Sequence, residues 1–193
     1  KYFHGFLESD TNTTSNRYIL GRGLEWSNKK SLIISLSEII IYSGENRPLD
    51  FSYINPVSLH LEAEYNNRTN LPGFDNGNAV WQLSVDSKIR KQYRFLFNFL
   101  VDEFKIDKVD YDKGKTNGLA WSSKLIYSPN YFNKLLSIHC SFIYVGTHTF
   151  RHGLGSNNFV SRGSPLGWKY GSDGKEIASG VNYTNFKNFV FYF

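Results

Sequence analysis

The segment from residue 44 to residue 56, GENRPLDFSYINP, holds the side chains best suited to ligand chemistry. Planar amide and guanidinium groups pair with sugar hydroxyls, and an aromatic ring covers the apolar face of a sugar. The candidate glycan-binding residues here are Glu45, Asn46, Arg47, Asp50, Tyr53 and Asn55. The structural alternative is that Glu45 and Arg47 pair with neighbouring strands and hold the loop, while the prolines at either end fix its path.

A second candidate segment is THTFRHGLGSNN at 147–158, within a glycine-rich stretch at 146–174 that predicts a long loop. His148 and His152 have a spacing that binds zinc on a helix, but the glycines disfavour a helix and no third ligand is evident. We therefore expect no metal and no cofactor. The loop is better suited to contacting a glycan or to folding back as a plug. Its candidate contact residues are Arg151, His152, Asn157 and Trp168.

A third group is acidic: Asp102, Glu103 and Asp107. A glycosidase needs two carboxyl groups that face each other across the scissile bond. Neighbouring residues of a strand point to opposite faces, so Asp102 and Glu103 cannot form such a pair. Glu38 or Glu45 from another strand could complete one. We nevertheless expect a binding protein and not an enzyme.

The segments that must position these residues alternate between apolar and polar side chains, as β-strands do. The chain is 17% aromatic and contains only 5 Pro, a composition that favours strands. The expected strands are 2–8, 18–26, 32–41, 79–85, 93–107, 119–127, 136–144 and 177–193. Residues 57–75 are compatible with either a strand or a short helix. Counted generously, the chain holds seven to nine strands in one domain, with long loops near 44–57 and 146–174.

The segment 32–41 indicates what surrounds these strands. Its ten residues are too few for a transmembrane helix but suit a tilted transmembrane strand, which needs about 9–11 residues. Leu32, Ile34 and Leu36 point one way and the serines between them the other, as in a barrel with an apolar outside and a polar inside. Glu38 breaks this phase, and Arg22 breaks it in the strand before. The expected fold class is all-β, an antiparallel up-and-down transmembrane β-barrel.

Three strings carry a family resemblance. SEIIIYSGENRPLDFSYINP at 37–56, LVDEFKID at 100–107 and SPLGW at 164–168 are, in this order, similar to segments of the bacterial outer-membrane capsule assembly Wzi family, particularly its Bacteroidetes-type members. The resemblance implies an outer-membrane β-barrel that binds capsular polysaccharide and retains it at the cell surface. Barrels of that family are larger, so it also implies that these residues form part of the wall.

The net charge and a few individual residues limit which partners and surroundings we expect. The formal net charge is +5, but Lys and Arg are scattered, so we expect no nucleic-acid partner. Cys140 excludes an internal disulfide, and its apolar phase predicts a lipid-facing or packed side chain. The absence of Met predicts a start within a longer reading frame or after a processed leader. Phe193 after alternating aromatics resembles a barrel-assembly signal, and truncation there is the alternative.

Together these features predict a non-enzymatic surface lectin in the bacterial outer membrane. Its partners would be capsular or extracellular polysaccharide and membrane lipid, with capsule-export or secretion machinery as a further candidate. Many weak contacts, from residues such as Arg47, Tyr53 and Trp168, would hold the polymer by avidity. Two alternatives remain open: a porin-like channel or accessory of a secretion or gliding apparatus, and a soluble secreted glycan-binding β-sandwich with the apolar rows sealed in its core.

Overall fold

A computed structural model describes residues 1–8, 15–55, 77–103, 117–131, 134–153, 155–184 and 190–192. The segment 57–75 and the residues Asp107, Phe189 and Phe193, all considered in the sequence, lie outside these ranges. The described strands are β1 (Tyr2–Leu7), β2 (Ser15–Ser27), β3 (Leu32–Glu45), β4 (Asn78–Arg90), β5 (Tyr93–Glu103), β6 (Gly118–Tyr127), β7 (Asn130–Tyr131), β8 (Lys134–Val145), β9 (Val160–Ser161), β10 (Ser164–Pro165), β11 (Gly174–Thr184) and β12 (Val190–Tyr192). The described helices are α1 (Phe51–Ile54) and the 3₁₀ turn η1 (Gly155–Asn157).

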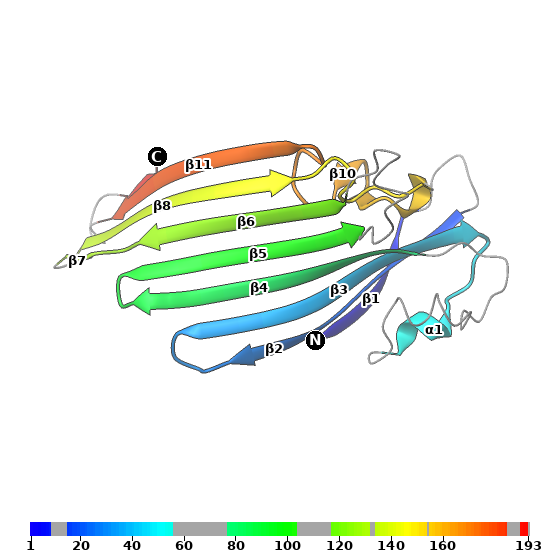
Figure 1. The fold of residues 1–193 in the computed structure, drawn as a ribbon, viewed down its shortest axis with the longest axis horizontal. Coiled ribbons are helices and arrows are strands. Elements are labelled where there is room, and N and C mark those ends of the chain that lie inside the picture. The colour runs from blue at the N-terminus through cyan, green and yellow to red at the C-terminus, as the bar shows by residue number, and fades with distance from the viewer. Residues whose placement is uncertain are drawn as a thin grey trace.

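The all-β antiparallel fold is confirmed. The main sheet follows the order β1-β2-β3-β4-β5-β6-β8-β11-β12, with β7 paired to β8, so its long strands are neighbours in chain order once the short strands β7, β9 and β10 are left aside (Figure 1). Long strands such as β2 and β3 are paired along their whole length, from Ser15 opposite Glu45 to Ser27 opposite Ile33. Strands β9 and β10 form a separate two-stranded sheet. The loop expected at 146–174 therefore contains short regular elements.

The two ends of the sheet differ. At one end, β2–β3 and β4–β5 are joined by tight turns, such as the one where Asn28 Oδ1 accepts hydrogen bonds from the backbone N–H groups of Lys30, Ser31 and Leu32. At the other end lie the longer connections β3–β4 and β8–β11 (Figure 1). We call these the turn end and the loop end. Within the described residues, no helix has the length and hydropathy needed to cross a membrane.

The cross-strand register gives the sheet one apolar face. A row at one level reads Leu24, Leu36, Leu83, Phe99, Trp121 and Tyr144 across six strands. The next row toward the turn end reads Trp26, Ile34, Val85, Phe97, Ser123, Phe142 and Ile177. Many of these side chains are open to solvent: Leu24 is 81% exposed and Ile177 76%. Within the described residues no second sheet covers this apolar face.

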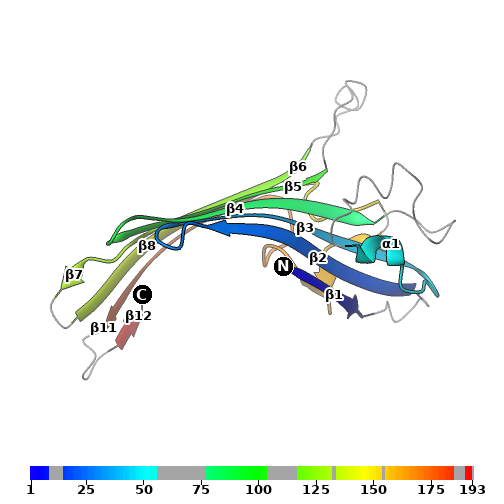
Figure 2. The ribbon, with the colours of Figure 1, turned by 90° about the horizontal axis from the view of Figure 1, so that it is seen from below.

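The opposite face is polar. Its matching row reads Glu25, Ser35, Ser84, Asn98, Ser122, Ile143 and Glu176. The sheet is strongly curved, and the segment that carries β9 and β10 lies on its concave side (Figure 2). There Phe150 and Phe159 pack with Ile41 and Val80 in the polar-face core at the loop end. The concave face is therefore the polar one, and the apolar face is convex.

Candidate functional site

The two candidate segments lie on opposite faces of the sheet. Residues 46–55, which we call the strap, fold back onto the apolar face at the loop end, where Tyr53 stacks on Tyr42 with ring centroids 4.6 Å apart. Residues 146–173, which we call the plug loop, pack on the polar face through Phe150 and Phe159. The structure therefore does not combine the two segments into one glycan-binding surface.

The strap is held by a buried ion pair. Arg47 and Asp50 are both fully buried, and Arg47 Nη2 lies 3.2 Å from Asp50 Oδ2. The guanidinium also lies 4.8 Å from the centre of the Tyr42 ring, a cation–π contact, and donates to the Ser43 carbonyl. Asp50 caps α1 by accepting from the Ser52 backbone N–H. These contacts use the side chains that sequence reasoning assigned to a sugar.

The strap residues therefore divide by exposure. Arg47, Asp50 and Tyr53 are buried, so in this structure they cannot contact a polymer, and we assign them the structural role that was the alternative. Asn46 and Asn55 are exposed, as is Glu45 at the end of β3, just before the strap. Asn46 has a positive φ of 50° at the turn that ends β3, a conformation that Asn tolerates better than most residues.

The plug loop is fastened to the wall by buried polar contacts. Arg17 of β2 donates to the carbonyls of Ser156, Asn158 and Val160 at 2.7, 3.1 and 3.0 Å. Asn157, which is fully buried, accepts from the Ser43 hydroxyl at 2.6 Å, and its carbonyl accepts from Asn78 at 3.1 Å. Asn157 thus anchors the loop and is not available to a sugar.

The carboxylate of Asp102 belongs to the same fastening, since it accepts a hydrogen bond from the Phe150 backbone N–H. Thr149 adds a hydrogen bond to the Leu119 carbonyl. Asp102 is 7% exposed and its carboxylate makes this contact, while Glu38 lies on the other face in an ion pair with Arg22. Asp102 and Glu38 therefore have separate structural partners on opposite faces, while Asp107 and the Glu103 side chain lie outside the described part of the chain.

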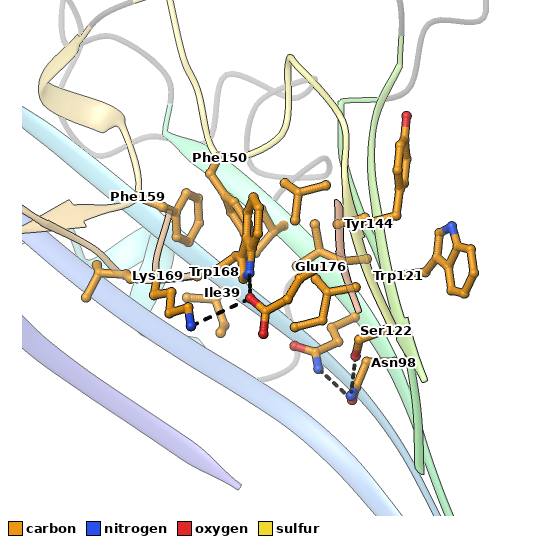
Figure 3. Close-up of a pocket in the computed structure, with 18 residues that line it drawn as sticks. Ile39, Asn98, Trp121, Ser122, Tyr144, Phe150, Phe159, Trp168, Lys169 and Glu176 are labelled. Atoms are coloured by element: carbon orange, nitrogen blue, oxygen red, sulfur yellow. Dashed lines mark hydrogen bonds and ion pairs between the residues drawn. The ribbon is translucent and has the colours of Figure 1, made fainter. Parts of the chain in front are cut away.

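Between the plug loop and the sheet lies a cavity of about 430 Å³. Its apolar part is formed by Ile39, Val80, Leu100, Phe150 and Phe159, and its polar part by Gln82, Asn98, Ser122, Lys169 and Glu176, with Trp168 between them. Figure 3 shows these two parts around the same space, while Trp121 and Tyr144 point away from it on the far side of the strands. Pockets of roughly 300–1,000 Å³ that are mostly apolar with a few convergent polar groups are typical small-molecule sites.

The polar side chains of the cavity form two connected groups. The amide nitrogen of Gln82 donates to Ser84 and Asn98, and Asn98 donates to Ser122, giving a ladder across β4, β5 and β6. On the loop side, Trp168 Nε1 donates to Glu176 at 3.0 Å, and Lys169 Nζ lies 3.7 Å from the same carboxylate (Figure 3). The pKa of Lys169 is raised, first by its hydrogen bond with Tyr170 and then by the charge of Glu176.

Gly174 lets Trp168 take this position. A Cβ at Gly174 would lie 2.5 Å from the Trp168 ring, closer than real contacts allow, so the ring rests directly on the β11 backbone. Gly167 makes room for Phe150 in the same way, since a Cβ at Gly167 would lie 2.4 Å from the Phe150 ring. The two glycines thus bring both aromatic rings against the wall of the cavity.

Of the residues expected in the plug loop, only Trp168 lines the cavity. Arg151 is exposed and bonds Ser172, and the His152 backbone N–H donates to Asn158. Among the described residues, no group of three His, Cys, Asp or Glu side chains is placed to hold a metal ion. Sequence reasoning missed Gln82, Asn98 and Ser122. The alternation of each strand placed these side chains on the face opposite the aromatic residues. The cross-strand register that brings the three together could not be predicted from the sequence.

Searches against protein-family models, curated proteins and solved structures found no match for this chain.

Proposed function

We propose that this chain forms part of the wall of a bacterial outer-membrane β-barrel that binds capsular or extracellular polysaccharide at its loop end. The observation that carries the proposal is the split between the two faces of one curved sheet. Large apolar side chains that are open to solvent form continuous rows on the convex face, while serines, amides and charged groups occupy the concave face. This division suits a barrel wall whose convex face contacts lipid and whose concave face contacts water.

The height of the apolar face supports the membrane assignment. Trp121 and Tyr127 lie on this face of β6 and, at a rise of about 3.3 Å per residue, are about 20 Å apart along the strand. Trp121 stacks with Phe142, and Tyr127 with Tyr93, so each level carries paired aromatic rings. Aromatic girdles flank an apolar band of about 25 Å in outer-membrane barrels. A soluble monomer rarely exposes an apolar patch larger than a few hundred Å².

The remaining features agree with the same orientation. Short connections at one end and long ones at the other are typical of outer-membrane barrels, whose long loops are extracellular. The cavity and the plug loop lie at that loop end, where a surface polymer would be met. The resemblance of three segments to the Wzi family supplies the substrate class, polysaccharide. Fastening of the plug loop across the concave face favours a binding protein over an open channel.

Fractionation tests the membrane part of the proposal. The full protein should sediment with outer membranes, resist extraction at alkaline pH, and need detergent to stay in solution. Recovery in the soluble fraction without detergent would overturn the assignment and favour the β-sandwich alternative.

Polymer binding tests the second part. Detergent-solubilised protein should retain purified capsular polysaccharide from its own source on an affinity matrix. Variants at the loop end can be chosen by exposure, because Glu45, Asn46 and Asn55 are exposed and can be changed without disturbing the buried Arg47 and Tyr53. A triple change of the exposed residues to Ala that leaves retention unchanged would remove the strap from the binding surface. Failure of the unmodified protein to retain the polymer would overturn the proposed ligand class.

A further inference from the structure

The cavity under the plug loop is lined by polar groups, an aromatic ring and apolar side chains, whereas Arg47, Asp50 and Tyr53 of the strap are buried against the sheet. We infer that this cavity binds a single uncharged sugar residue that carries a methyl group, as an N-acetyl or 6-deoxy substituent. The inference rests on the proposed function for its polymer, of which this residue would be a terminal or side-branch unit. Three properties of the lining lead to it: its charge balance, its amide ladder and its apolar end.

The charge of the cavity is balanced within the lining. Among the described residues of the lining, Lys169 and Glu176 are the charged ones, and they pair with each other at 3.7 Å. The Trp168 N–H adds a second donor to the Glu176 carboxylate. A carboxylate- or phosphate-bearing sugar would need a cation that is not already committed, and the described lining provides none. The cavity therefore suits an uncharged ligand.

The amide ladder leaves hydrogen-bonding capacity on side chains that line the cavity. Both N–H groups of the Gln82 amide are used, on Ser84 and Asn98, so its carbonyl oxygen remains as an acceptor. Asn98 gives one N–H to Ser122 and keeps the other, and the Ser122 hydroxyl that accepts it keeps its own proton. One acceptor beside two donors is the arrangement that reads neighbouring hydroxyl groups or an acetamido group.

The other end of the cavity is apolar and cannot satisfy a hydroxyl. Val80, Leu100, Phe150 and Phe159 line it, and Phe159 is 4% exposed. Burying a hydroxyl without a hydrogen bond is unfavourable, whereas burying a methyl group is favourable. Trp168 supplies an aromatic ring beside the ladder, suited to the apolar face of a sugar ring. The cavity thus prefers a sugar with a methyl-bearing substituent over plain glucose.

Titration of the detergent-solubilised full protein with four monosaccharides tests the inference. N-acetylglucosamine or L-rhamnose should bind, measured by saturation-transfer NMR and by Trp fluorescence. Glucose should bind at least several-fold more weakly and glucuronate not at all. Asn98→Leu keeps the volume but removes the centre of the ladder and should weaken binding about tenfold. Trp168→Phe should remove the fluorescence change. Equal binding of all four sugars, preference for glucuronate, or binding by Asn98→Leu equal to that of the unmodified protein would overturn the inference.

Two controls separate folding from binding. Ser141→Ala changes the same polar face outside the cavity and should bind like the unmodified protein. Ser122→Ala makes a smaller change than Asn98→Leu and should weaken binding to an intermediate degree, with an unchanged unfolding transition. A protein that sediments with outer membranes and retains the polymer, but binds none of the four sugars, overturns this inference alone. A protein that binds the sugars but stays soluble without detergent overturns the proposed function alone.

Discussion

Arg22 and Glu38, the two charges that break the apolar phase of their strands, are direct cross-strand partners and neutralise each other. Arg22 Nη2 lies 2.5 Å from Glu38 Oε2, and the two side chains are 7% and 4% exposed. Trp81 Nε1 donates to the other Glu38 oxygen, and Arg22 Nη1 donates to the Asn55 carbonyl at the end of the strap. The apparent pattern errors are thus one network that ties the strap to β2, β3 and β4.

We predict that Arg22→Ala or Glu38→Ala strongly destabilises the fold, by about 3–5 kcal/mol, because each leaves a buried charge without its partner. Urea unfolding in detergent would measure the change. The matched control is Glu25→Ala, which removes the exposed Lys1–Glu25 pair and should cost no more than about 1 kcal/mol. If Arg22→Ala and Glu25→Ala cost the same, the pair is not buried as described.

A charge on the convex face should be costly and its neighbour on the concave face should not. Phe142 and Ser141 are adjacent on β8 and point to opposite faces. Phe142→Arg would place a cation in lipid, at a cost of about 2–4 kcal/mol near the bilayer midplane. Ser141→Arg would place it against water. Folding yield into lipid vesicles should therefore fall for Phe142→Arg and stay near normal for Ser141→Arg. The reverse order would contradict the lipid-facing assignment.

Cys140 offers a probe that needs no mutation. It is the one cysteine of the chain, and it is exposed on the apolar face, in the row with Leu125 and Phe95. In outer membranes a charged maleimide should label it slowly, and an environment-sensitive fluorophore attached there should report an apolar surrounding. Unfolding in urea should restore fast labelling. Fast labelling of the folded protein by the charged reagent in membranes would place Cys140 in water.

The contact between Glu8 and the plug loop should depend on pH. The pKa of Glu8 is lowered, first by the Arg162 backbone N–H and then by the Ser161 hydroxyl, which donates at 2.8 Å. A lowered pKa means that the contact is fully formed above the ordinary Glu value of about 4.3 and is lost as pH falls through the lower folded value. The NMR shift of the Arg162 amide should therefore titrate with a midpoint below the ordinary Glu pKa of about 4.3. Glu8→Gln should abolish the titration, and a midpoint above the reference would contradict the contact.

Releasing the plug loop should change permeability before it changes the fold. Arg17→Ala removes three hydrogen bonds to loop carbonyls and leaves the strand pairing of β2 intact. Planar-bilayer conductance of the full protein should be low and should rise with Arg17→Ala, together with protease cleavage between 146 and 173. The control is Arg151→Ala, which removes only the exposed bond to Ser172. High conductance of the unmodified protein would favour the porin-like alternative.

The sequence by itself determined the strands and their two faces, because a side chain's face follows from its position in a period of two, which needs no knowledge of neighbours. It placed Leu36 opposite Ser35 and singled out Trp168, which the structure places in the lining of the cavity. It left two roles open for Arg47, Asp50, Tyr53 and Asn157, since a polar side chain in a loop looks the same whether it meets a ligand or the chain's own carbonyls, and their burial favours the structural one. Only the tertiary structure decided that Arg22 meets Glu38, that strap and plug loop cover opposite faces, and that Gln82, Asn98 and Ser122 join across three strands. Each of these depends on cross-strand register, which is set by packing between residues far apart in the chain.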